Sequence, residues 1–174
     1  MLLLRHAKSS WDDPKLPDHA RPLNARGRHA ARAMRSVMQD LGLAPDLVLV
    51  SSARRTLQTL EALEPWDETP LIEPMDALYL ADPKQILKVV QGVAETVRSV
   101  LLVGHNPGLH EFAVKLVGAE TNPLANPDMR RLIDGYPTGA LAEFVVPGAW
   151  KRLGPGGGRL VRFLCPRDLP EHAA

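Results

Sequence analysis

Cysteine is nearly absent from this sequence, which has a single one, Cys165, among 174 residues. One thiol excludes an internal disulfide, and this is typical of a protein from a reducing compartment. A free cysteine is most often a small, buried, apolar residue, and we interpret Cys165 in that way rather than as a reactive group.

Long apolar runs are also missing, because no stretch approaches the roughly 20 residues that a membrane-spanning helix needs. The opening Met-Leu-Leu-Leu is similar to the start of a signal peptide. However, Arg5 and His6 interrupt it after three leucines, far short of a secretory apolar core. We therefore expect a cytoplasmic protein without a membrane partner.

An excess of either charge is missing as well, since 21 Lys and Arg stand against 20 Asp and Glu. This balance gives no broad basic surface for nucleic acid, so any anion site must be local. The composition, 45% apolar and 24% charged, is ordinary for a globular protein. The length fits one domain, residues 1–174, and we expect a monomer.

Short apolar runs alternate with amphipathic segments along the chain. Strands are expected at 2–4, 46–50, 70–74 and 99–103, and helices at 25–41, 52–63, 83–97 and 107–117. Residues 140–146 and 159–164 are expected to pair as a hairpin across a glycine-rich turn. Alternating strands and helices predict an α/β fold, a three-layer α/β/α sandwich with a mostly parallel central sheet.

Polar motifs directly follow three of the expected strands. The first leads into Arg5-His6, the second into Ser-Ser-Ala-Arg-Arg (51–55) and the third into Gly-His-Asn (104–106). Because the carboxyl ends of parallel strands share one edge of the sheet, we expect two histidines and at least two arginines to meet there. Ser51 and Ser52 are expected mainly to cap the following helix.

These residue types together predict a phosphate site. A guanidinium presents a fixed fork of donors that suits phosphate oxygens, and helix starts add free backbone N–H groups. Nearby positive charge also disfavours the imidazolium form, which leaves a ring nitrogen free at neutral pH. His6 is then able to attack phosphorus.

The same motifs resemble those of the histidine phosphatase superfamily. LLRHAKSSW is similar to its Arg-His-Gly motif, with Ala7 in place of glycine, and LLVGHNPGL is similar to its second histidine motif. SSARRTLQT resembles its Ser-x-x-x-Arg-x-x-x-Thr motif, whose spacing selects Arg55 rather than Arg54. The length, RPLNARG (21–27) and YPTGALAEF further resemble the small SixA-like phosphohistidine phosphatase branch.

The resemblance implies that His6 is a nucleophile that carries phosphate transiently, while Arg5, Arg55 and His105 hold the phosphoryl oxygens without a cofactor or metal. Asp76, three residues before Tyr79, is the nearest counterpart of the acidic proton donor of larger members. It is either that donor, a group that activates water, or a solvated loop carboxylate. An alkoxide needs such an acid to leave, whereas the imidazole of a phosphohistidine needs little help.

Three further residues are candidates for substrate binding. Lys8 lies close enough to the pocket to bind phosphate or a substrate protein, or it is simply exposed. Arg21 either reaches the site or pairs with a loop carboxylate such as Asp18. Asn106 either donates to phosphate or caps the helix that Pro107 begins.

We expect a phosphatase that removes phosphate from a protein histidine. One alternative is hydrolysis of a small phosphate ester, although the chain lacks room for the large insertion that small-substrate relatives carry between the second and third motifs. Another is a non-catalytic phosphoprotein-binding domain, which would not need His6. A zinc site is not expected, because His105 and His110 are five residues apart and no third ligand is evident.

Overall fold

The computed structural model describes residues 1–118 and 126–169, and in this part of the chain six strands form one sheet. The strands are β1 (Leu2–Arg5), β2 (Leu47–Ser51), β3 (Leu71–Met75), β4 (Val100–Gly104), β5 (Leu141–Val145) and β6 (Arg159–Leu164). Their order is β3-β2-β4-β1-β5-β6. The first four pair in parallel, and β5 and β6 run antiparallel as the predicted hairpin.

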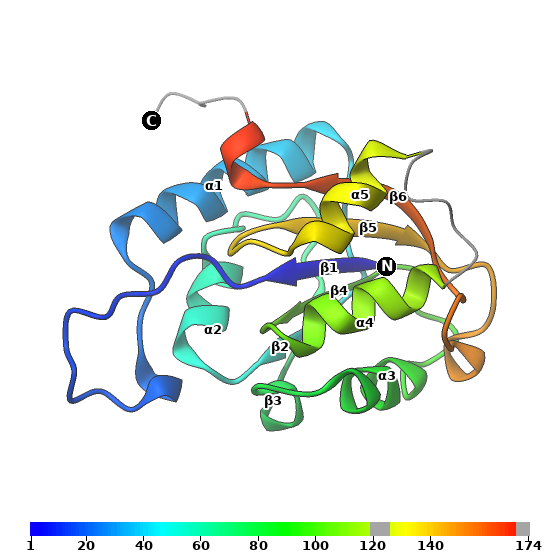
Figure 1. Cartoon of the computed structure of the whole chain (residues 1–174), viewed down its shortest axis with the longest axis horizontal. Helices are drawn as coiled ribbons and strands as arrows, with labels where there is room; N and C mark the ends of the chain where they lie inside the picture. Colours follow the sequence, from blue (N-terminus) through cyan, green and yellow to red (C-terminus); the bar gives the residue numbers. More distant parts are fainter. Residues whose placement is uncertain (119–125, 170–174) are drawn as a thin grey trace.

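Helices cover both faces of this sheet (Figure 1). The helices are α1 (Ala25–Asp40), α2 (Arg54–Glu61), α3 (Pro83–Gln91), α4 (Gly108–Val117) and α5 (Pro127–Asp134). Met34 of α1 and Leu60 of α2 pack on one face with Leu4. Phe112 of α4 and Met129 of α5 pack on the opposite face, together with residues of α3. The predicted three-layer sandwich is therefore confirmed.

The central strands β1, β2 and β4 are almost entirely apolar because both of their faces are buried between helices, whereas the edge strand β3 is largely exposed. Leu3 and Leu102 are fully buried among the residues that pack with α3, α4 and α5, whereas Leu2, Leu4 and Val103 are buried among those that pack with α1 and α2. Cys165 is also buried, as predicted. Within the described residues, no helix is long and apolar enough to cross a membrane.

Two helix starts follow the capping signals that the sequence contains. The Asn24 side chain accepts a hydrogen bond from the Gly27 amide at 2.8 Å, and Asp82 accepts one from the Gln85 amide at 2.9 Å. The far end of α3 differs from the prediction, because the helix ends at Gln91 and not at residue 97. Gly92 serves as its C-cap, and Val93 enters the core from outside the helix.

Helix α5 has no counterpart among the predicted elements. The Asn126 side chain caps it by accepting from the amides of Asp128 and Met129, at 2.9 and 3.3 Å, and Pro127 is its first residue. This is the same cap-then-proline signal that correctly predicts α3, so the sequence contained the information.

The segment between β1 and α1 makes an excursion away from the sheet and returns, as the dark blue loop in Figure 1 shows. Its two ends are joined by a bridge between Ser9 and Leu23 and by a hydrogen bond from the Ser10 amide to the Pro22 carbonyl at 2.8 Å. Within the loop, a short 3-10 helix, η1 (Asp18–Ala20), packs against α2. The loop thus brings Asp18 to the carboxyl edge of the sheet.

Candidate active site

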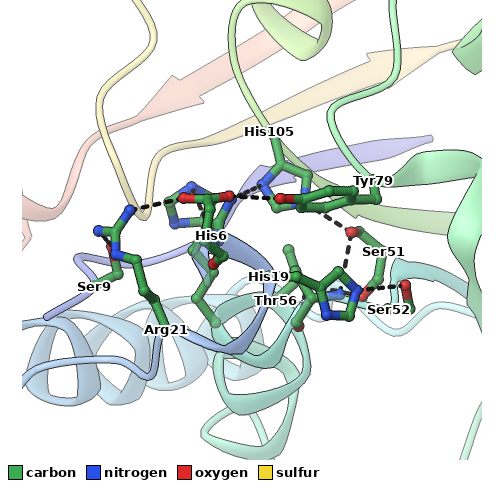
Figure 2. Close-up of polar contacts among 12 residues, drawn as sticks. His6, Ser9, His19, Arg21, Ser51, Ser52, Thr56, Tyr79 and His105 are labelled. Atoms are coloured by element: carbon green, nitrogen blue, oxygen red, sulfur yellow. Dashed lines mark hydrogen bonds and ion pairs between the residues drawn. The ribbon is translucent and has the colours of Figure 1, made fainter. Parts of the chain in front are cut away.

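The carboxyl ends of β1, β2 and β4 bring a group of polar side chains together (Figure 2). The ends of β1 and β4 are in register, so His6 and His105 follow adjacent strands. The His6 amide donates to the Gly104 carbonyl at 3.1 Å, and the two imidazole centroids are 5.2 Å apart. Ser51, the last residue of β2, contacts His105 Nε2 through its hydroxyl at 2.7 Å. The two histidines that the sequence places at strand ends therefore share one site.

The His6 ring is fixed in one tautomer. Its Nδ1 lies 2.7 Å from the Ala7 carbonyl oxygen, which is an acceptor only, so Nδ1 carries the hydrogen. Nε2 consequently carries a lone pair, which accepts a long hydrogen bond from the Arg55 guanidinium. Only 8% of His6 is exposed, so the imidazole is oriented and also largely shielded from water.

Arg55, in the first turn of α2, lies between the two imidazoles. Its Nε donates to His6 Nε2 at 3.4 Å, and its Nη2 donates to His105 Nδ1 at 3.3 Å. Since His105 Nδ1 accepts from Arg55, the hydrogen of that ring is on Nε2 and points to Ser51. Arg55 as a whole is 3% exposed, and its guanidinium contacts both rings with its fork of donors.

The Asp18 carboxylate lies over this arrangement and joins three side chains. One oxygen accepts from Arg21 Nη1 at 2.8 Å, and the other accepts from Arg55 Nη2 at 2.9 Å and from the Tyr79 hydroxyl at 2.7 Å. The Asp18 backbone carbonyl accepts a further bond from Arg55 Nη1 at 2.7 Å. Asp18 therefore fixes the orientation of Arg55, a role that the sequence did not reveal beyond a pairing with Arg21.

Arg21 and Arg5 are placed differently relative to the histidines. The Arg21 side chain is buried and bonds Asp18, the Ser9 hydroxyl and the Ser10 carbonyl, so the predicted ion pair with Asp18 is present. Arg5 Nη1 donates to the Tyr136 carbonyl at 2.8 Å, while its Nε is buried without a hydrogen-bond partner among the described residues.

Asn106 follows His105 and lies near Arg5. The predicted helix cap is wrong for this residue, because Pro107 is the N-cap of α4 and the Asn106 side chain donates instead through Nδ2 to the Tyr136 carbonyl at 3.0 Å. Its Oδ1 is buried and has no partner among the described residues. Asn106 and Arg5 thus share one backbone acceptor at the rim of the site.

Lys8 and Asp76 remain outside the cluster that surrounds His6. Both are exposed, and within the described part of the chain neither side chain has a hydrogen bond or ion pair. Their roles in substrate binding and proton transfer stay predictions. Arg54 is exposed as well, and its neighbour Arg55 is the arginine that faces the histidines.

The predicted capping role of Ser51 and Ser52 is wrong. Ala53 is the N-cap of α2 and the helix has no side-chain cap. The Ser51 hydroxyl contacts His105, and the Ser52 hydroxyl contacts His19 Nε2 at 3.0 Å. The Ser51 hydroxyl also accepts from the Ala53 amide at 3.4 Å, just before the helix begins.

The sequence and the fold of this chain are both similar to those of known proteins. Residues 1–78 match the sequence model of the histidine phosphatase superfamily, branch 1. A solved structure titled "putative phosphohistidine phosphatase SixA", from Agrobacterium tumefaciens, is 32% identical and has a TM-score of 0.78, with 95% of this chain and 96% of that chain covered. The chain belongs to the histidine phosphatase superfamily. Within it, the chain is a member of the SixA-like branch.

Two further relatives in this superfamily comparison are similar to the chain over nearly its whole length. A SixA structure from Nakamurella multipartitia, titled "putative" in the same way, is 29% identical, with a TM-score of 0.82 and coverage of 95% of this chain and 94% of that chain. The uncharacterized protein ML1117 of Mycobacterium leprae is 32% identical over 167 residues, which is 94% of this chain and all of the relative. The similarity therefore extends well beyond the first two motifs.

The superfamily motif Arg-His-Gly reads Arg-His-Ala here, and the structure accommodates the extra methyl group. Ala7 is fully buried and packs with Leu23 and Ala31. Its amide donates to the Thr59 hydroxyl at 2.9 Å, and Thr59 is the threonine of the second superfamily motif. The alanine thus keeps the backbone that positions His6 and contacts the second motif directly.

Both histidines of this superfamily site are held neutral. Burial lowers the pKa of His6 to about 4, and the positive charges of Arg55, Arg5 and Arg21 add to this effect. Burial lowers the pKa of His105 to about 3, with His6 and Arg55 acting in the same direction. For Asp18, burial opposes ionisation, but hydrogen bonds from Tyr79 and Arg55 lower its pKa to about 2. At neutral pH the site therefore contains two neutral imidazoles and an ionised carboxylate.

These pKa values predict a measurable pH dependence. A histidine with an ordinary pKa near 6.5 is mostly protonated at about pH 5.5, whereas His6 and His105 are expected to stay neutral there. In ¹⁵N NMR titrations, the ring-nitrogen shifts of both residues should remain those of neutral imidazole down to about pH 5. Assignment uses His6→Asn and His105→Gln, and titration of either ring near pH 6.5 would contradict the prediction.

The same depressed pKa values link stability to pH. Below about pH 6.5 the unfolded chain binds protons on these histidines that the folded chain does not bind until near pH 4 or below. The free energy of unfolding should therefore fall as the pH drops through this window, by up to about 1.4 kcal/mol per pH unit for each imidazole. Urea unfolding at pH 7 and pH 5 measures the difference, which should be smaller in His6→Asn.

Proposed function

We propose that this protein is a phosphohistidine phosphatase, which hydrolyses phosphate from a protein histidine through a covalent phosphohistidine on His6. The observation that carries the proposal is the His6 ring, which is neutral, fixed by Ala7 and directed through Nε2 at a buried guanidinium. A neutral imidazole nitrogen is a competent nucleophile for phosphorus. The names of the solved relatives from Agrobacterium and Nakamurella support the same substrate class.

In the proposed first step, His6 Nε2 attacks the phosphorus atom and the bond from phosphorus to the nitrogen of the substrate histidine breaks. The other nitrogen of the substrate ring has already taken a proton from solvent, so the ring leaves with that electron pair as a neutral imidazole. Arg55 and Arg5 donate to the phosphoryl oxygens, where the charge of the transition state is concentrated.

In the proposed second step, water attacks the phosphorus and the bond to His6 Nε2 breaks, which releases inorganic phosphate and restores the free enzyme. His105 faces the same space through Nδ1. A bound phosphoryl dianion would favour protonation of this nitrogen, because a nearby opposite charge raises a pKa. His105 then becomes a further donor to the phosphoryl group. Arg5 and Arg55 balance the negative charge of the phosphoryl oxygens, so the reaction needs no metal.

The acidic residues near the site favour a phosphohistidine substrate over a phosphate ester, because neither of them is a positioned proton donor. Asp18 is ionised at neutral pH and already accepts from Arg21, Arg55 and Tyr79, so it has no proton to give. Asp76 is exposed, and its side chain makes no hydrogen bond or ion pair within the described residues. A leaving alkoxide needs a positioned acid, which contributes about 10²–10⁴-fold to the rate, whereas imidazole leaves without one.

The test compares two substrates of the wild-type enzyme, a histidine-phosphorylated protein and an alkyl phosphate monoester, whose leaving alkoxide needs a positioned acid. We expect kcat/KM for the protein to exceed that for the ester by at least about 10²-fold, the contribution of the missing acid. Rapid quenching should trap ³²P on the peptide that contains His6, with the acid lability and alkali stability of phosphohistidine. Activity should persist after treatment with EDTA. Faster turnover of the ester, or label on another residue, would contradict the proposal.

A further inference from the structure

A basic cleft of about 210 Å³ opens beside the segment that follows β1 and begins with His6. Its cations are Lys8, Arg26 and Arg167, and Thr138 and Pro166 form part of its wall. None of the residues that line it is acidic. The cleft is distinct from the space between His6 and His105, because none of the residues that contact those rings lines it.

Residues that line the cleft are close neighbours of the backbone that carries Arg5 and His6. Lys8 is two residues beyond His6, and Thr138 precedes Gly139, whose amide lies 3.0 Å from the His6 carbonyl and 3.1 Å from the Arg5 carbonyl. Arg167 follows the end of β6, which lies at the same edge of the sheet as the end of β1. A chain segment with its phosphohistidine at His6 therefore has this cleft as a neighbour.

The start of α1 is pressed against the Lys8 backbone. A Cβ atom on Gly27 would lie 2.1 Å from the Lys8 carbonyl oxygen, so glycine is required for this close approach. The Lys8 carbonyl also accepts from the Asn24 amide at 3.0 Å. This packing keeps the backbones that carry Lys8 and Arg26 together on one side of the cleft.

The positively charged side chains of the cleft are largely without ion-pair partners among the described residues. Lys8 and Arg26 have no ion pair within the described residues, and the Arg167 side chain is 75% exposed and reaches Asp168 only at 3.6 Å. A second cleft on α1 shows the contrast, because there Arg28, Arg32 and Arg35 face Glu61 and Glu64. Positive charge is therefore concentrated next to the site although the whole chain is nearly neutral.

We propose that this cleft binds acidic side chains of the substrate protein that flank its phosphohistidine; the inference rests on the proposed function. The exposed, flexible tips of one lysine and two arginines suit several carboxylates in varied arrangements, unlike the buried and fixed guanidinium of Arg55. Such contacts add substrate selectivity without touching the reacting atoms. Lys8, Arg26 and Arg167 are thus specificity-determining residues.

The test uses two histidine-phosphorylated peptides that differ only in glutamate or glutamine at the positions around the phosphohistidine. We expect the wild type to prefer the glutamate peptide by about tenfold in kcat/KM, the sum of a few exposed ion pairs. In Arg26→Glu/Arg167→Glu this preference should disappear or reverse, while kcat/KM for a chromogenic ester stays within about twofold of the wild type. The wild-type preference should also weaken at high salt.

Arg159→Glu is the matched control, because Arg159 is exposed at the opposite end of the sheet, at the start of β6, and its reversal should leave the preference intact. An unchanged preference in the double variant, or an equal loss for peptide and ester, would overturn the role of the cleft while leaving the proposed function in place. If the wild type releases phosphate from neither peptide faster than spontaneous hydrolysis, the proposed function fails and the cleft inference fails with it.

Discussion

Replacing His6 with asparagine is expected to lower kcat for phosphohistidine hydrolysis by about 10⁴-fold or more, which is the scale seen when a covalent nucleophile is removed. Asparagine can still donate a hydrogen bond to the Ala7 carbonyl, as His6 Nδ1 does at 2.7 Å, so the backbone should keep its position. It offers no nitrogen lone pair to phosphorus. Phosphate release from a histidine-phosphorylated protein in single-turnover conditions measures the loss.

Two controls separate chemistry from folding in this variant. Thermal unfolding should be close to that of the wild type, and inorganic phosphate should still bind in calorimetry, because Arg5 and Arg55 remain. The ³²P label on the enzyme should vanish entirely. Retention of more than about a tenth of the wild-type rate would show that another group attacks phosphorus, and the proposed mechanism would be wrong.

The sheet and the strand-end cluster follow from local patterns in the sequence. Apolar runs such as Leu2–Leu4 have no polar alternation, which predicts strands with both faces buried and helices on each side. The carboxyl ends of neighbouring parallel strands lie at one edge of the sheet. This geometry places His6 and His105 together, although they are about a hundred positions apart in the chain. For these residues, position along a strand was enough to predict proximity.

Other parts of the site depend on contacts that no local pattern specifies. Asp18 lies on a loop of 3-10 and irregular structure, and although its pair with Arg21 is local, its ion pair with Arg55 depends on how that loop folds back over α2. Ser51 and Ser52 carry a capping signal, yet neither caps α2, and their hydroxyl groups have the long-range partners His105 and His19. Asn106 deviates from its capping signal in the same way.

Asp18 connects the loop to catalysis through Arg55. Its carboxylate and its backbone carbonyl each accept one hydrogen bond from the guanidinium, which holds the fork in place before any substrate is present. A fixed donor costs little reorganisation when a phosphoryl group arrives. Since the backbone bond survives in Asp18→Asn, this variant should lose less activity than one that lacks the guanidinium itself.

Arg55→Ala is expected to lower kcat/KM for phosphohistidine hydrolysis by about 10³-fold, the effect of losing a preorganised charged donor. The substitution removes the group that contacts His6 Nε2 and His105 Nδ1, at 3.4 and 3.3 Å. It also removes one of the positive charges that, with burial, lower the pKa of His6. Steady-state kinetics measure the first effect, and ¹⁵N titration of His6 measures the second, which should appear as a higher pKa.

Arg55→Lys distinguishes charge from geometry at the same position. An ammonium restores the positive charge but not the planar fork that reaches both rings and Asp18, so kcat/KM should recover only to about 10²-fold below the wild type. The His6 pKa should return toward its wild-type value, because that shift depends on charge. Full activity in Arg55→Lys would mean that the planar fork is dispensable. A kcat/KM of Arg55→Ala within about threefold of the wild type would show that Arg55 does not contact the phosphoryl group.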